Sequence, residues 1–231
     1  MTVLASTTTY WYLTRSTGAV ALLLLSATVA LGVVDLRRTA SARWPRFVVD
    51  ELHRNLALLT LVFLVLHILT SVLDSFAPIS LTASVIPFAS SYRPFWLGLG
   101  AVSFDLLLAV IITSLARKRV GYRGWRAVHW LSYGAWPVAL LHGFGTGSDV
   151  NSGWLQLLSA ICVLVVLAAV IVRIGASRDI SPRARGVAAG GTAAFTLFLL
   201  IWLPAGPLGS EWARRSGTPS KLLPKTRHAH R

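Results

Sequence analysis

Four histidines stand inside apolar stretches of this chain, and they fall into two pairs. His53 and His67 lie 14 positions apart, and His129 and His142 lie 13 positions apart. At 1.5 Å per residue these offsets correspond to rises of about 21 Å and 19 Å along a helix. One such histidine would ordinarily be an interhelical hydrogen-bond partner. Two pairs with matched rises indicate two helices that face each other, histidine to histidine, at two depths.

The helical phase of the two pairs differs. On an ideal helix the directions of His53 and His67 differ by about 40°, so both can face one partner, whereas those of His129 and His142 differ by about 140°. Pro137 lies between the second two and follows Gly134. Proline removes a backbone hydrogen bond and kinks a helix. We therefore expect a local change of phase between His129 and His142.

The spacing limits the chemistry that these pairs can support. Zinc needs three or four clustered ligands, which two pairs about 20 Å apart cannot supply. A haem iron takes axial ligands from opposite sides, and histidines on facing helices provide them. We predict two stacked b-type haems (protoporphyrin IX iron), one held by His53 and His129 and the other by His67 and His142. The alternative is a non-redox membrane protein, a small transporter or assembly subunit, whose histidines are structural or relay protons.

Composition and hydropathy define the helices that position these residues. Hydrophobic residues make up 55% of the 231 residues and charged residues 13%, whereas soluble domains carry about 25% charged residues. Six stretches are long enough to cross a bilayer, at about 16–36, 47–76, 95–116, 125–144, 154–174 and 187–203. We predict an all-α integral membrane protein, a six-transmembrane helix bundle over residues 1–209. A flexible basic tail follows over residues 210–231.

The basic residues provide a topology signal. Lysine and arginine number 22 against 8 acidic residues, a net charge of +14. They gather in alternate predicted loops, at 37–46, 117–126 and 173–185. By the positive-inside rule these loops face the cytoplasm, so both termini are extracytoplasmic. The charge therefore reflects topology and not nucleic-acid binding. Six basic residues in the tail oppose this assignment, which leaves open an acidic docking partner or a different topology at the last helix.

Three arginines are candidates for binding haem propionates. Arg54 follows His53, Arg126 precedes His129, and Arg93 lies in a loop that otherwise lacks basic residues. Arginine suits bidentate pairing with carboxylates. For Arg54 and Arg126, snorkelling to the membrane surface is an equally good interpretation. Asp105, in the middle of the third span, is interpreted as a helix–helix bond or a proton relay.

At these residues the chain resembles the ferric reductase-like transmembrane domain family, which includes ferric reductases, NADPH oxidases and the membrane subunit of a bacterial methionine sulfoxide reductase. The resemblance rests on Leu13-Thr14-Arg15-Ser16-Thr17-Gly18, on His53-Arg54 with His67, and on Gly124-Trp125-Arg126-Ala127-Val128-His129 with His142. It implies that these four histidines are haem ligands, and having all four is similar to the two-haem members.

The resemblance also implies partners. Family reductases carry a cytoplasmic flavin and nicotinamide module after the last span, whereas the tail here shows no G-x-G-x-x-G and no strand pattern. We therefore expect no flavin or NAD(P)H on this chain, which would be the electron-transfer subunit of an oxidoreductase in the lipid bilayer of a bacterial plasma membrane. Its electrons would come from a cytoplasmic reductase or a membrane quinol. They would leave to ferric iron or a flavoprotein outside the cytoplasm.

Overall fold

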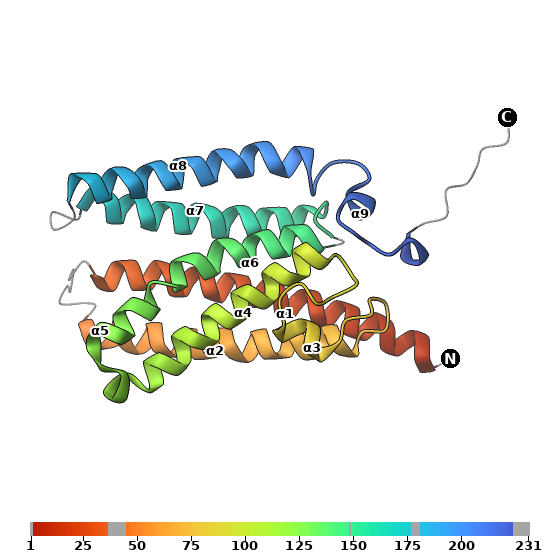
Figure 1. The fold of residues 1–231 in the computed structure, drawn as a ribbon, viewed down its shortest axis with the longest axis horizontal. Coiled ribbons are helices and arrows are strands. Elements are labelled where there is room, and N and C mark those ends of the chain that lie inside the picture. Colours follow the sequence, from red (N-terminus) through yellow and green to blue (C-terminus); the bar gives the residue numbers. More distant parts are fainter. Residues whose placement is uncertain (1, 37–44, 148, 177–180, 224–231) are drawn as a thin grey trace.

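The computed structural model describes residues 2–36, 45–147, 149–176 and 181–223, and these form a bundle of helices (Figure 1). In chain order the helices are α1 (Thr2–Leu36), α2 (Arg46–Leu73), α3 (Leu81–Val85), α4 (Pro94–Leu115), α5 (Arg117–His129), α6 (Ser132–Thr146), α7 (Gly153–Ala176), α8 (Pro182–Ala205) and α9 (Trp212–Arg215), followed by a 3-10 turn, Ser220–Leu222. The described residues contain no strand, so the expected all-α fold class is confirmed.

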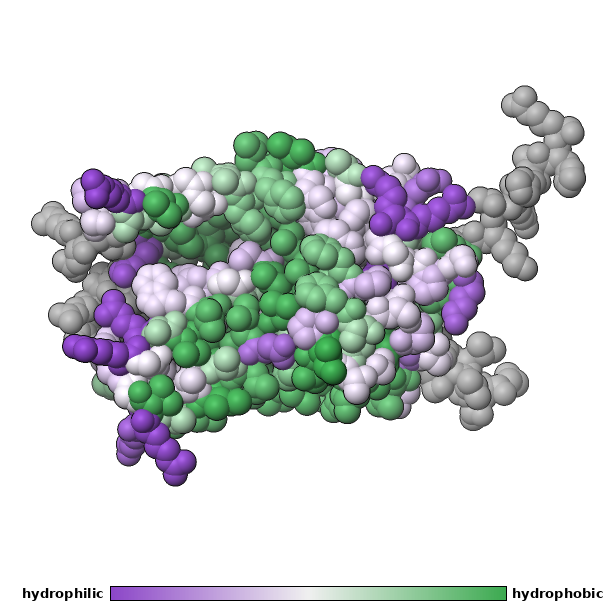
Figure 2. Space-filling model, viewed as in Figure 1, coloured by the Kyte–Doolittle hydropathy of each residue, from purple (hydrophilic) through white to green (hydrophobic). Residues whose placement is uncertain are grey.

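Five of the described helices are long and apolar enough to cross a membrane: Thr9–Val33 of α1, Phe47–Leu73 of α2, α4, Gly153–Gly175 of α7, and α8. They correspond to five of the six predicted spans. Their hydrophobic side chains are largely exposed on the outside of the bundle, and hydrophilic residues gather mainly at its two ends (Figure 2). An apolar belt between two polar ends is the surface that a lipid bilayer covers. The chain is therefore an integral membrane protein.

The predicted fourth span, 125–144, is not one helix, and the count of six spans is not confirmed. It is divided between α5 and α6, which are separated at Trp130 and Leu131. The amides there bond three residues back, with Leu131 N donating to Val128 O at 2.9 Å and Gly134 N to Leu131 O at 2.9 Å. This is the tighter pattern of a 3-10 turn. Pro137, where we expected the kink, lies inside α6.

The buried apolar core lies between α1, α6, α7 and α8. Its central side chains are Leu25, Trp136, Leu140 and Phe144, which pack with Val166 and Leu199. The Trp136 indole donates to Ser26 Oγ at 2.8 Å, which joins α6 to α1. This core fixes α6 against α1, and α1 in turn packs along α2. The helices α2 and α6, which carry His53, His67 and His142, are thus held in place through α1.

One end of the bundle, which we call the α3/α9 end, holds α3, α9 and both described terminal segments (Figure 1). Residues 210–223 differ from the flexible tail that we expected, because they pack against this end. Trp212 lies 5.2 Å from the Trp96 ring and its indole donates to Gly145 O at 3.1 Å. This aromatic contact and this hydrogen bond hold the segment against the bundle. The opposite end, which we call the α5 end, carries the loop between α4 and α5.

Candidate functional site

The structure brings the four histidines together in the two cross-helix pairs that were expected. His67 on α2 and His142 on α6 have ring centroids 6.3 Å apart, with the ring planes at 83°. His53 on α2 and His129 at the end of α5 are also 6.3 Å apart, at 59°. The first pair lies towards the α3/α9 end and the second towards the α5 end. The helix α2 thus faces α5 and α6 with paired imidazoles at two depths of the bundle.

The break between α5 and α6 contributes to the phase at which both pairs face α2. A 3-10 turn advances about 120° per residue, compared with about 100° in an α-helix. Each residue of the turn at Trp130 and Leu131 therefore adds about 20° to the phase of His142 relative to His129. This supplies part of the change of phase that the 13-residue spacing required, and it lies directly after His129 and not at Pro137.

Three of the histidines are fixed by hydrogen bonds to backbone carbonyls. His67 Nδ1 donates to Thr14 O at 2.8 Å, His53 Nδ1 to Thr28 O at 3.1 Å, and His142 Nδ1 to Trp96 O at 2.9 Å. A carbonyl oxygen only accepts, so the proton of each neutral imidazole is on Nδ1. This leaves Nε2 of each ring with a free lone pair. A metal-binding histidine requires this tautomer.

His129 differs from the other three histidines. Its Nδ1 atom is buried and has no hydrogen-bond partner among the described residues. The ring lies 5.0 Å from the Trp125 ring, at an interplanar angle of 31°. An unpaired buried nitrogen is costly, so this position calls for an explanation.

The pair geometry fits an axially ligated iron. Two metal–imidazole bonds of about 2 Å each, extended to the ring centres, place the centroids roughly 6 Å apart. Both observed separations are 6.3 Å. In the part of the chain that the structure describes, no three residues of the types His, Cys, Asp and Glu come together as a metal cluster. A two-ligand axial site is therefore a better fit to these residues than a zinc site.

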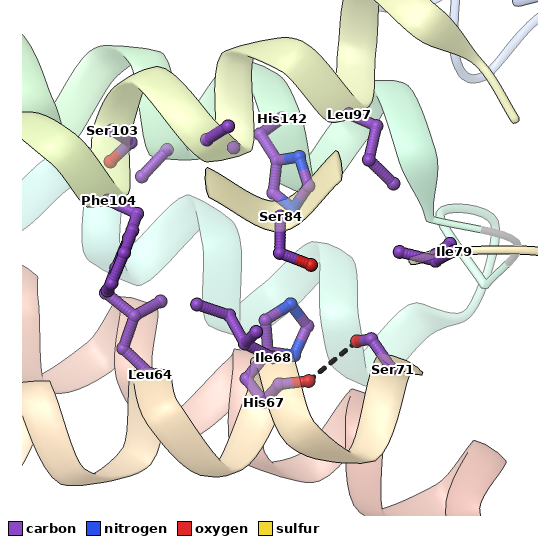
Figure 3. A pocket seen from close by; sticks show the side chains of 13 residues that line it. Leu64, His67, Ile68, Ser71, Ile79, Ser84, Leu97, Ser103, Phe104 and His142 are labelled. Atoms are coloured by element: carbon purple, nitrogen blue, oxygen red, sulfur yellow. Dashed lines mark hydrogen bonds between the residues drawn. The ribbon is translucent and has the colours of Figure 1, made fainter. Parts of the chain in front are cut away.

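A pocket lies between His67 and His142, and its space, including the open mouth, is about 570 Å³. Figure 3 shows the two rings pointing towards each other into it, with Phe104 and Leu64 at one side. Most of the lining is apolar, and Gly100 and Ala101 line it from α4 without large side chains. An apolar pocket between two facing imidazoles suits a porphyrin.

The three candidate arginines lie in different surroundings. Arg93 is 4% exposed, and its side chain donates to Gly145 O at 2.9 Å and to Thr218 Oγ1 at 2.9 Å. Burial lowers the pKa of the Arg93 guanidinium. Arg54 is exposed and pairs with Glu51 at 2.6 Å, and Arg126 is exposed on α5. The propionate role of all three stays a prediction.

Three further residues of the membrane-spanning region differ in exposure. Asp105 is partly exposed on α4. Trp130 is exposed, whereas Trp136 belongs to the core. The two histidines of the tail, His228 and His230, lie outside the described residues.

Sequence reasoning missed the glycines beside the histidines. A Cβ atom at Gly18 would lie 2.9 Å from the His67 ring, one at Gly100 would lie 2.5 Å from His142 Nδ1, and one at Gly32 would lie 3.3 Å from His53 Cε1. Gly18 and Gly32 are 14 positions apart, the same offset as His53 and His67. That matched offset is the signal that could have found them.

A family model described as "Ferric reductase like transmembrane component" matches residues 17–140, more than half of the chain. The match includes three of the paired histidines and ends two residues before His142. Neither the curated proteins nor the solved structures give a match.

Proposed function

The chain belongs to the ferric reductase-like transmembrane family, and on this premise we propose that it transfers electrons across the membrane through two b-type haems. One observation carries the proposal. Two pairs of imidazoles face each other at 6.3 Å, at two depths of an apolar bundle. No arrangement for packing alone needs the same separation twice.

The residues of the chain would hold the haems and orient the imidazoles that bind them. The carbonyls of Thr14, Thr28 and Trp96 fix three imidazoles as neutral rings with Nε2 directed away from the bond. The apolar helices exclude water and keep the rings uncharged. Haem iron, when bound, supplies reversible one-electron chemistry. His53, His67, His129 and His142 are the proposed axial ligands.

We propose that α5 and α6 together form the sixth crossing. Their combined length takes the chain from the α5 end to the α3/α9 end, as Figure 1 shows. The 3-10 turn between them keeps most backbone groups bonded, which hydrocarbon demands. A broken helix is tolerated within a membrane where protein covers it.

The proposed orientation places the α5 end in the cytoplasm. Its exposed basic residues are Arg117, Lys118, Arg119, Arg123 and Arg126, which is the distribution that the positive-inside rule requires. Arg215 is one of the basic residues that opposed this assignment. It donates to Ala205 O at 2.9 Å and to Ser210 O at 3.1 Å. A cation at the end of α8 thus has a structural reason to be there.

In this orientation electrons enter near His53 and His129 and leave near His67 and His142. The donor is a cytoplasmic reductase or a membrane quinol, and the acceptor is ferric iron or a flavoprotein outside the cytoplasm. Arg54 and Arg126 stand at the end where propionates of the first haem would emerge. The surroundings of Arg93 favour a structural role, because its guanidinium is already bonded on two sides.

The proposal is tested by an optical spectrum of the full chain purified in detergent from haem-replete cells. We expect reduced b-type bands and two haems per chain by a pyridine haemochrome assay. A folded, monodisperse preparation without colour would overturn the proposal and favour a non-redox membrane protein whose histidines are structural.

A further inference from the structure

Three of the four histidine rings rest on neighbouring helices in the same way. Each Nδ1 bonds a backbone carbonyl of residue i, and the residue at i+4 is glycine: Thr14 with Gly18, Thr28 with Gly32, and Trp96 with Gly100. Each glycine Cα faces the ring that is bonded to that carbonyl. We call the carbonyl of residue i, together with residue i+4, a histidine seat.

The physical reason for glycine is steric. In a helix the carbonyl of residue i already accepts the amide of residue i+4, so an imidazole must approach it beside residue i+4. A Cβ atom there would lie 2.9 Å from the His67 ring and 2.5 Å from the His142 ring. Both distances are shorter than non-bonded carbon atoms allow. At positions 18 and 100 only glycine leaves the carbonyl open from the side, whereas a Cβ atom at position 32 would lie 3.3 Å from His53 Cε1, which a small shift of the ring relieves.

The seats are in register on both helices. On α1 the two seats are 14 residues apart, the same step that separates His53 from His67. The same step along α4 from Trp96 and Gly100 leads to Val110 and Ser114. This is the fourth seat, at the depth of His129, the one histidine whose Nδ1 has no partner among the described residues.

The fourth seat is closed. Ser114 stands where the other three seats have glycine, and its hydroxyl donates to Val110 O at 2.7 Å. The Trp125 indole donates to the same hydroxyl at 3.1 Å, and its ring packs against His129. Ser114 thus carries the Cβ atom that the three glycines lack, and its hydroxyl is already bonded to the Val110 carbonyl.

We propose that Gly18, Gly32 and Gly100 are positioning residues that admit axial histidines to backbone carbonyls, and that Ser114 denies His129 this hydrogen bond, so that the two haem sites differ in reduction potential. This inference rests on the proposed function. A bond from Nδ1–H to a carbonyl makes imidazole a stronger donor, and a stronger donor stabilises ferric iron and lowers the potential. The site of His53 and His129 has one such bond and the other site has two. The iron of the first site is the more easily reduced.

The direct test is to open the fourth seat. In the full haem-loaded chain, Ser114→Gly is compared with Ser114→Ala, which removes the hydroxyl but keeps the Cβ atom. Redox titration followed optically should show that Ser114→Gly lowers the higher of the two midpoint potentials, while Ser114→Ala leaves it closer to the wild-type value. Equal shifts in the two variants, or no shift in Ser114→Gly, would overturn the proposal.

The reciprocal test is to close an open seat. Gly18→Ala should displace His67 from the Thr14 carbonyl. This should raise the reduction potential of the haem held by His67 and His142 and alter its low-spin EPR signal. The control is Gly143→Ala, because a Cβ atom there meets nothing within 4 Å although the position adjoins His142. If Gly18→Ala leaves the potential and the EPR signal unchanged, the seat has no role. A wild-type chain without haem contradicts the proposed function itself, whereas a two-haem chain that is insensitive to Gly18 and Ser114 contradicts only this inference.

Discussion

The two histidine pairs have the same separation but lie in differently constructed surroundings. Around His67 and His142 both rings are bonded to carbonyls, and α3, the buried Arg93 and the Trp96–Trp202–Trp212 aromatic cluster cover the end of the bundle. Around His53 and His129 only one ring is bonded, the helix breaks directly after His129, and exposed arginines surround the end. The two pairs therefore have the same ring separation, although they differ in hydrogen bonding and in the residues that cover them.

The comparison teaches that the separation of the rings and their hydrogen bonding are specified independently. The separation follows from the packing of α1 against α2, and of α4 against α5 at one depth and against α6 at the other. The hydrogen bonding depends on one residue per seat, glycine in three and Ser114 in the fourth. One helix bundle can thus hold two chemically similar cofactors with different electronic properties.

The largest effect is expected from removing one ligand from each pair. His142→Ala and His129→Ala should each lose one of the two proposed haems, because a single imidazole remains on each iron. Haem content per chain measures this, and the spectrum of the remaining haem identifies the site. Gly143→Ala, beside His142, should retain both haems. Loss of both haems from either variant in a folded chain would show that the two pairs are not independent sites.

The next largest effect on haem retention is expected at Gly100, where the histidine ring lies closest to the glycine, and a smaller one at Gly32, where the contact is looser. A Cβ atom at position 100 lies 2.5 Å from His142 Nδ1, whereas one at position 32 lies 3.3 Å from His53 Cε1. We expect Gly100→Ala to weaken haem retention by about 10–100-fold, as loss of a supporting partner at a metal site does. Gly32→Ala should weaken it less, since a shift of a few tenths of an ångström relieves the contact. Haem loss to an excess of apomyoglobin measures both, and the reverse order would contradict the steric argument.

The stability of the α3/α9 end should depend on Arg93 more than on any exposed arginine. Its guanidinium joins the start of α4 to Gly145 at the end of α6 and to Thr218 in the C-terminal segment. Hydrogen bonds from a buried charged group contribute about 1.5–3 kcal/mol, so Arg93→Met should destabilise the chain by about 2 kcal/mol and expose residues 212–223 to protease. Thermal unfolding in detergent and limited proteolysis measure these changes. Arg214→Met, at an exposed position, is the control, and equal sensitivity of the two variants would count against the role of Arg93.

Much of this arrangement is predictable from the sequence because helix geometry is regular. The rises of the two histidine pairs follow from 1.5 Å per residue, so the pairing of His53 with His129 and of His67 with His142 follows from residue spacing and loop charge alone. The five long spans follow from hydropathy in the same way. The fourth span could not be predicted as two helices, because Gly134 and Pro137 pointed to a kink further along the span than the 3-10 turn at Trp130 and Leu131.

The supporting residues were less predictable because they act through backbone atoms. The Thr14 carbonyl is invisible to a search for chemically active side chains, and Gly18 acts only by lacking a Cβ atom. The position of residues 210–223 also depended on tertiary contacts, since Trp212 packs against the rings of Trp96 and Trp202. Arg93 and Arg54 were both candidates for binding propionates, yet Arg93 is buried between three segments and Arg54 is on the surface.

The smallest expected effect is at Arg54, and it is the sharpest contrast with Arg93. The Arg54 side chain is 66% exposed and pairs with Glu51 on the same helix, and such pairs contribute about 0.5 kcal/mol or less. Arg54→Gln should therefore leave stability unchanged. If Arg54 contacts a propionate, loss of its positive charge should lower the potential of the haem held by His53 and His129 and leave the other unchanged. Glu51→Gln is the matched control, because it breaks the ion pair but keeps the arginine charge. A potential that does not respond to Arg54→Gln would mean that this arginine serves only the membrane surface, and that charge at the α5 end sets topology and not redox chemistry.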